Sequence, residues 1–109
     1  MSNVKVPEEK TEPKIFFDNV VSLLVNCIEN RDIRLIADIL QDLARRFDIY
    51  LKIRPREIAL VKLKPMPYDN GVEVYVVNKY GLEITLRIFK TDKYVDSVEV
   101  FYSLSLVCG

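Results

Sequence analysis

Residues 72–90 read VEVYVVNKYGLEITLRIFK, and this stretch decides the fold. On both sides of its centre, apolar residues occupy alternate positions, a pattern typical of β-strands with one buried face. The central NKYGL, at 78–82, suits a three-residue hairpin loop with Gly81 in the left-handed conformation. The stretch therefore predicts two antiparallel strands, at 72–78 and 82–90.

The short loop also predicts which residues of the two strands lie opposite each other. If residue 78 faces residue 82, the pairs are Val76 with Ile84, Val74 with Leu86 and Val72 with Ile88. The same register continued into a last strand pairs Ile88 with Val98, Leu86 with Val100 and Ile84 with Tyr102. Nearly all these residues are aliphatic, as expected when burial sets the register.

Two further strands are indicated, at 57–64 and 95–107, so that four strands follow one another as a meander. Residues 49–54 also alternate between apolar and polar side chains. This short segment is either a fifth, edge strand or the end of the preceding helix, and the pattern alone leaves both interpretations open.

The N-terminal part has a helical period instead. Two adjacent apolar stripes are Phe16, Val20, Leu23 and Cys27, and Phe17, Val21, Leu24 and Ile28. So wide an apolar surface predicts the central helix of the core, buried on more than one side. We expect it to begin near Lys14, with Thr11 as its N-cap.

A second helical stripe follows, made of Ile33, Ile36, Leu40, Leu43 and Phe47. At about 100° per residue it points roughly 150° away from the first, so one straight helix would be buried on opposite sides. We therefore expect a break near Asn30, which would cap a second helix from Arg31.

The predicted fold is a two-layer α+β sandwich, with two helices packed on one face of a four- or five-stranded antiparallel meander. The chain has 109 residues and half of them are hydrophobic, which suits one domain. We expect this domain to span 14–109, after a flexible tail at 1–13 that is rich in proline and charge.

Charge and composition narrow the function classes. Sixteen Lys and Arg balance sixteen Asp and Glu, which removes the simplest argument for a nucleic-acid or anionic-membrane protein. Without His the chain lacks imidazole metal sites and the commonest general base. There is no signal peptide or membrane span, so we expect a cytoplasmic protein. Abundant Ile and Val and a single Gln favour a heat-adapted source.

The two cysteines, Cys27 and Cys108, lie too far apart in the sequence for a small disulfide framework. We interpret Cys27 as a buried thiol and Cys108 as a free one. An intermolecular disulfide through Cys108 is the alternative.

The second face of the predicted sheet mixes charges with aromatic residues. Glu73 and Glu99 lie across from Arg87, one on each neighbouring strand, where opposite charges attract. Two helices cover only one side of a sheet, so this face needs another partner or stays open to water. We expect a protein interface made by Tyr75, Arg87, Phe89 and Phe101. The alternative is that these aromatic residues only favour strand formation.

The length of the last strand suggests a second copy of the chain. Residues 95–107 are longer than the neighbouring strands, so backbone groups from Leu104 onward would have no partner. Pairing with the same strand of another copy is the symmetric solution. The sequence therefore predicts a homodimer that uses Leu104 and Leu106.

The alternative function is nucleic-acid binding through the basic stretch at 45–64. Its basic residues are Arg45, Arg46, Lys52, Arg54, Arg56, Lys62 and Lys64, against only Asp48 and Glu57. Clustered Lys and Arg are what phosphate contacts need. Glutamates on the same sheet face would repel phosphate, which makes this the second interpretation.

Catalysis is the third possible function. The carboxylates Glu73, Glu83, Glu99 and Asp96 could serve acid–base chemistry, but Arg87 is placed to hold them in structural ion pairs. The chain has no nucleophile elbow and no glycine-rich loop. We predict a protein that is not an enzyme and that has no metal site and no cofactor.

Overall fold

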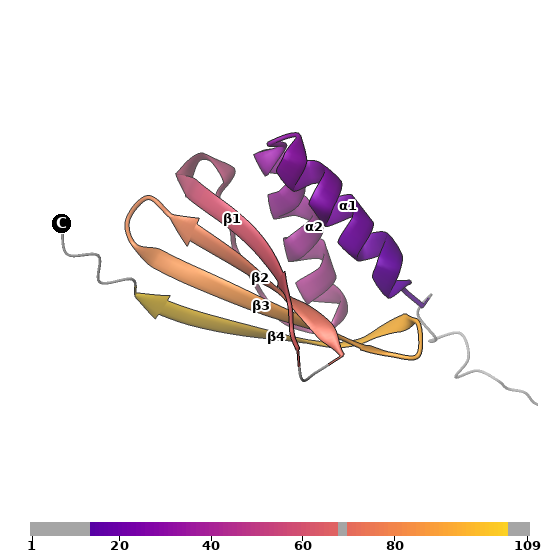
Figure 1. Cartoon of the computed structure of the whole chain (residues 1–109). Helices are drawn as coiled ribbons and strands as arrows, with labels where there is room; N and C mark the ends of the chain where they lie inside the picture. Colours follow the sequence, from indigo (N-terminus) through magenta and orange to yellow (C-terminus); the bar gives the residue numbers. More distant parts are fainter. Residues whose placement is uncertain (1–13, 68–69, 105–109) are drawn as a thin grey trace, which may run out of the picture.

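The computed structural model describes residues 14–67 and 70–104 of the chain. Its elements are α1 (Phe17–Glu29), α2 (Ile33–Arg46), a short 3-10 helix (Pro55–Glu57), β1 (Ile58–Pro65), β2 (Gly71–Asn78), β3 (Leu82–Thr91) and β4 (Tyr94–Leu104). The four strands form one antiparallel sheet in the order β1-β2-β3-β4, and both helices lie on the same side of it (Figure 1). The predicted two-layer α+β fold is confirmed.

The strand register is the predicted one. Leu86 lies between Val74 on β2 and Val100 on β4, and the other predicted pairs also match. Gly81 has a φ of 92°, the left-handed conformation that the three-residue loop requires. Because strand side chains alternate between faces, this register sends one apolar set toward the helices.

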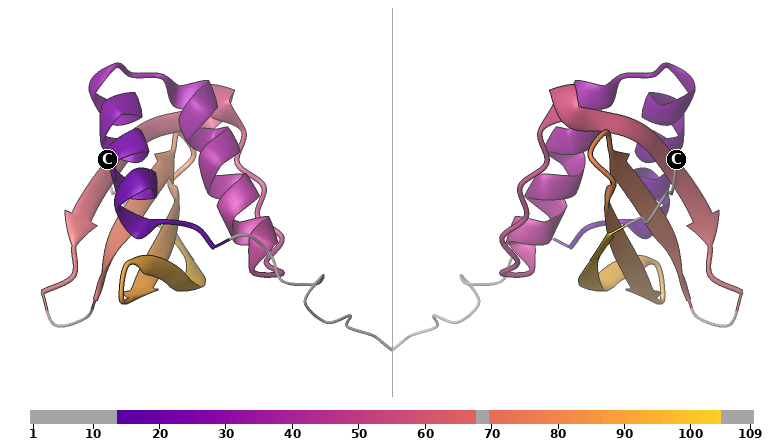
Figure 2. Two further views of the ribbon diagram at one scale, coloured as in Figure 1. Left: turned by 90° about the vertical axis from the view of Figure 1, so that its right-hand side faces the viewer. Right: turned by 90° about the vertical axis from the view of Figure 1, so that its left-hand side faces the viewer.

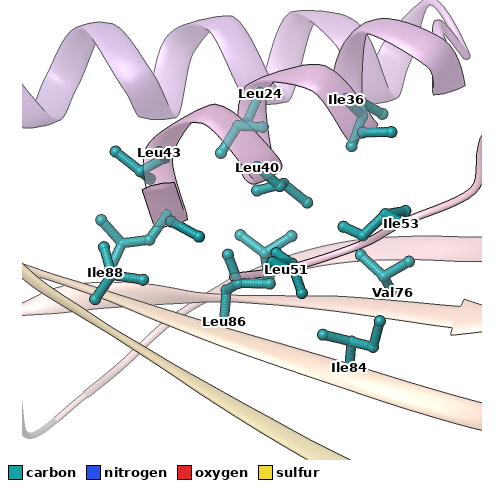
Figure 3. Close-up of a cluster of buried hydrophobic side chains, with 14 of the residues drawn as sticks. Leu24, Ile36, Leu40, Leu43, Leu51, Ile53, Val76, Ile84, Leu86 and Ile88 are labelled. Carbon is teal, nitrogen blue, oxygen red and sulfur yellow. The ribbon is translucent and has the colours of Figure 1, made fainter. Parts of the chain in front are cut away.

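The core lies between the helices and the sheet. Leu24 of α1, Ile36 and Leu40 of α2, and Leu86 and Ile88 of β3 are fully buried. Figure 3 shows the side chains of α2 pointing down onto those of the strands, with Leu51 and Ile53 beside them. Burial of apolar area in this layer is the main source of the stability of the domain.

The central helix is α2 and not α1, so the prediction for the first helix was wrong. α2 buries five residues, Ile36, Ala37, Leu40, Leu43 and Ala44, whereas α1 buries Phe17, Leu24 and Cys27. Figure 2 shows α2 between α1 and the chain that leads to β1. With neighbours on two sides and the sheet below, α2 buries more of its residues than α1, in which Leu23 and Val25 are exposed; on α2 only the outer side, with Leu35, is exposed.

The helix ends also differ from the prediction. α1 begins at Phe17 and not near Lys14, because the chain before it pairs with the start of β4. The Phe17 N–H donates to the Lys93 carbonyl at 2.9 Å, and Val95 N–H donates to the Ile15 carbonyl at 2.8 Å. The proposed cap, Thr11, lies outside the described residues.

The break between the helices occurs where the phase argument placed it, but Asp32 is the cap of α2, not Asn30. Asn30 ends α1, and Arg31 then adopts a φ of 57°, which stops the helix. The Asp32 carboxylate accepts a hydrogen bond from the Leu35 N–H at 3.3 Å, as an N-cap should.

Residues 49–54 are neither a strand nor the end of a helix. They are extended chain outside the sheet, with Leu51 and Ile53 buried. The Gln41 side chain accepts a hydrogen bond from the Ile53 N–H at 3.1 Å. The alternation at 49–54 therefore reflects burial under one side of α2 and not pairing with a strand.

At both edge strands the structure differs in detail from the prediction. An irregularity between Ile58 and Leu60 turns Ile58 toward the core, whereas strict alternation along the strand would put Ile58 on the second face with Leu60. On β4, Leu104 lies opposite Leu82, so the predicted overhang does not begin at Leu104. Residues 105–107, including Leu106, lie outside the described residues.

None of the described helices is both long enough and apolar enough to cross a lipid bilayer.

Candidate functional site

One face of the sheet is covered by the helices, and over the other no described element lies (Figure 2). We call this second side the open face. Across the four strands its side chains form three rows: Leu60, Val77, Glu83 and Ser103; Lys62, Tyr75, Thr85 and Phe101; Lys64, Glu73, Arg87 and Glu99. The third row alternates basic and acidic residues from one edge of the sheet to the other.

The ion pair at the centre of the charged row is well defined. Arg87 Nε lies 2.8 Å from Glu73 Oε2, and the Glu73 side chain is only 16% exposed. The Tyr75 hydroxyl donates to the other carboxylate oxygen, Oε1. Both oxygens of Glu73 therefore have a donor, which is the condition for placing a carboxylate in a half-buried site.

The surroundings of Glu73 hold it ionised. The hydrogen bond from Tyr75 lowers its pKa most, Arg87 and Lys64 lower it further, and burial opposes them. The same hydrogen bond, together with burial, raises the pKa of Tyr75. The contact therefore favours the ionised form of Glu73 and the protonated form of Tyr75.

Two cations of the charged row, Lys64 and Arg87 of the ion pair itself, lie over aromatic rings. The Arg87 guanidinium carbon is 4.9 Å from the centre of the Phe101 ring, and Lys64 Nζ is 5.4 Å from that of Tyr75. Cation–π contacts of this length are attractive. Lys64, Tyr75, Glu73, Arg87 and Phe101 thus form a chain of contacts across all four strands, which we call the open-face network.

The predicted interface residues are only partly brought together. Tyr75, Arg87 and Phe101 belong to the open-face network. Phe89 is on the same face, half-buried, between Gly71 and Ser97. Leu104 is 73% exposed but alternates onto the helix side, at the end of β4 that extends past the helices (Figure 1). Leu106 lies outside the described residues.

The predicted nucleic-acid residues are spread over both layers of the fold. Arg45 and Arg46 end α2 and share Asp42, at 3.0 and 3.4 Å. Arg54 lies 3.8 Å from Glu57, beside Arg56 in the 3-10 helix, and Lys52 is in the extended segment before it. Lys62 and Lys64 belong to the open face, on the opposite side of the sheet from α2. The stretch is continuous in sequence and divided in space.

The other reactive groups are isolated or occupied. Within the described chain Arg87 pairs with Glu73 and not with Glu99. In residues 14–67 and 70–104 no three acidic or thiol side chains are grouped as they would be around a metal ion. Cys27 is buried, and burial, with a smaller effect of the Asp32 charge, raises its pKa. Cys108 lies outside the described part.

Sequence reasoning identified the Glu73–Arg87 pair but missed the roles of Lys64 and of the Tyr75 hydroxyl. A signal for both was present. Tyr75 is two positions after Glu73 and so shares its face, and Lys64 is opposite Glu73 once β1 and β2 are aligned.

No protein-family model, curated protein or solved structure matches this chain.

Proposed function

We propose that this chain is a non-catalytic, homodimeric binding protein that recognises another protein through the open face. The observation that carries the proposal is the open-face network. It fixes an arginine and two aromatic rings on an uncovered sheet before any partner arrives. Side chains that are already ordered lose little conformational entropy on binding, so their contact area adds directly to affinity.

The chemistry of the network suits a protein surface. Arg and Tyr are the residue types that contribute most at protein interfaces. The Arg87 side chain is 42% exposed and Phe101 is 47% exposed, so both remain available for contacts while they touch each other. Alternating charges in the row from Lys64 to Glu99 favour a partner with the complementary order of charges.

The titratable groups of the face support a binding role over a catalytic one. Glu73 has both oxygens engaged, and the raised pKa of Tyr75 keeps its phenol protonated at neutral pH. A general base needs a free lone pair within reach of the substrate and a pKa near the working pH. Glu73 has neither.

Nucleic-acid binding through Lys62 and Lys64 is the competing function, because Lys62 lies in the row that also contains Tyr75 and Phe101, and Lys64 lies over the Tyr75 ring. Bases can stack on such aromatic rings. Glu73, Glu83 and Glu99 share the face, however, and repel phosphate. Binding to labelled single-stranded and duplex oligonucleotides between about 50 and 200 mM salt separates the two functions, since phosphate contacts weaken steeply with salt.

The main experiment compares two matched lysine substitutions. Thr85→Lys places a long charged side chain in the middle of the open face, where Thr85 lies between Tyr75 and Phe101. Ser22→Lys makes the same change on the exposed surface of α1, in the other layer. We expect wild type and Ser22→Lys to capture the same proteins from the native host. Thr85→Lys should capture at least tenfold less of each of them.

Retention of the same proteins by the wild type and both variants would exclude the open face as the binding surface. Salt-sensitive oligonucleotide binding that disappears with Lys62→Glu would favour the competing function instead. Circular dichroism of each variant confirms that the sheet is intact.

A further inference from the structure

The two edges of the sheet are protected to different degrees. β1 carries Lys62, Lys64 and Pro65 and an irregularity between Ile58 and Leu60. Lysine, proline and bulges on an edge strand are the usual devices that stop it from pairing with another chain. β1 is therefore protected against association.

β4 has one of these devices near its start, a register irregularity between the pairs Phe89–Ser97 and Lys90–Val95, and none over the rest of its length. Its first residues are covered, because Phe16 forms a bridge with Tyr94 and Val95 donates to Ile15. From 97 to 104 (SVEVFYSL) no described segment pairs with the outer edge, and Glu99 is the one charged residue. This free edge is about 25 Å long at roughly 3.3 Å per residue.

Apolar side chains on both sides of this free edge are exposed. Phe101 on the open face is 47% exposed, while Tyr102 and Leu104 on the helix side are 56% and 73% exposed. The end of β4 extends past both helices, so no helix shields it (Figure 1). A long, apolar and unprotected edge strand is a site for adding another strand.

From these observations we propose that the free edge of β4 pairs with the same edge of a second copy, antiparallel, with Phe101 of each copy at the two-fold axis. This inference rests on the dimer in the proposed function and gives its interface. The two four-stranded sheets become one, and the two open faces become one continuous surface.

The register follows from comparing the symmetric alternatives. In an antiparallel pair about a two-fold axis, like charges directly opposite each other are destabilising. An axis at Glu99 would put two carboxylates face to face, and an axis at Val100 would put Glu99 against Phe101. An axis at Phe101 pairs Phe101 with itself, Glu99 with Ser103, Val100 with Tyr102 and Val98 with Leu104. This register covers exposed apolar groups on both faces without opposing charges. An axis at Tyr102 would also oppose no charges, but it would set Phe101 against Ser103, whereas the axis at Phe101 packs the two exposed Phe101 rings against each other.

The same register joins the two binding sites. Arg87 is stacked on Phe101 within each copy, at 4.9 Å. With the two Phe101 rings adjacent at the axis, the open-face networks of both copies form one continuous array. The open face of a single chain is then half of the surface that a partner meets.

Disulfide trapping tests the register directly. In a Cys108→Ser background, Phe101→Cys places two thiols opposite each other at the axis, close enough for a disulfide. We expect mild oxidation to give a covalent dimer at least tenfold faster than with the surface control Ser22→Cys. Glu99→Cys alone should form a covalent dimer no faster than the surface control. A mixture of Glu99→Cys chains and Ser103→Cys chains should form a disulfide between one chain of each kind.

If Glu99→Cys links to itself, or if Phe101→Cys links no faster than the control, the Phe101 register is wrong. Light scattering of the wild type gives an independent result, because a single-chain mass at all concentrations would overturn the dimer. Phe101→Asp should dissociate the wild-type dimer by placing two carboxylates at the axis, and an unchanged mass would also overturn it.

The outcomes separate this inference from the proposed function. Thr85 lies on β3, opposite Phe101 but one strand inside the β4 edge that pairs in the dimer. Thr85→Lys should therefore lose the partner while the mass of the dimer stays unchanged. A wild-type monomer whose partner binding still depends on Thr85 would overturn the dimer and leave recognition by the open face intact. A trapped dimer whose partner binding is unchanged by Thr85→Lys would support the dimer and exclude recognition through the open face.

Discussion

The two faces of the sheet come from alternate residues of the same strands and are held by different forces. On the helix side Val74 and Leu86 are fully buried and depend on apolar burial, which has no preferred direction. On the open face Glu73 and Arg87, their immediate neighbours, are held by directed contacts at 2.8 Å. The difference teaches that the first face supplies stability and the second supplies a fixed arrangement of groups for recognition.

The largest effect should come from the helix side. Leu86→Ala removes a fully buried side chain between β2 and β4 and leaves a cavity. We expect it to lower the free energy of unfolding by about 2–5 kcal/mol. Thr85→Ala, one residue away on the open face, should cost less than about 1 kcal/mol.

Urea unfolding at one fixed protein concentration measures both variants, since association adds to apparent stability. Equal losses for Leu86→Ala and Thr85→Ala would mean that the two faces contribute alike, and the contrast between them would be lost.

The ion pair on the open face should contribute much less. A double-mutant cycle with Glu73→Gln and Arg87→Met isolates the interaction between the two side chains. We expect a coupling free energy of about 0.2–1 kcal/mol, typical of a cross-strand charge pair. A coupling several times larger would make this face a source of stability comparable to the core.

The pH dependence of stability should also distinguish the faces, since the core cluster has no charged residue. The pKa of Glu73 is lowered in the folded protein, so its contribution is present above the ordinary Glu pKa of about 4.3. That contribution is lost as the pH falls through the lower, folded-state pKa. The stability advantage of wild type over Glu73→Gln should therefore shrink over this acid range.

Urea midpoints measured from neutral pH to about pH 2 follow this loss. A constant difference between wild type and Glu73→Gln would show that the folded and unfolded pKa values of Glu73 are the same.

The fold was largely predictable because its rules are local. The three-residue loop ending at Gly81 sets the register of β2 and β3, and the apolar alternation then assigns each residue to a face. The central position of α2 was not predictable in the same way. The stripes of α1 show how wide its apolar surface is, but not that Leu23 stays 44% exposed among the described residues.

In the candidate site, too, the sequence predicted the backbone register but not the side-chain contacts. Register alone placed Arg87 opposite Glu73, which needs only the backbone. The stacking of Arg87 on Phe101 and of Lys64 on Tyr75 depends on side-chain conformations, which alternation does not specify. The basic residues of the stretch at 45–64 do not form one surface patch, because the stretch begins at the end of α2, turns at Pro55 and continues into β1, whose lysines lie on the open face.

The smallest effect tests the hydrogen bond inside the open-face network. Tyr75→Phe removes the hydroxyl that lowers the pKa of Glu73 most and leaves Arg87 in place. The pKa of Glu73 should therefore rise toward its ordinary value without reaching it, as followed by NMR titration of its side-chain carboxyl carbon. Tyr50→Phe makes the same change on a residue that is 82% exposed, and it should leave the Glu73 titration unchanged. If both variants titrate like wild type, Arg87 alone holds the carboxylate, and Tyr75 is free to turn its hydroxyl toward a partner.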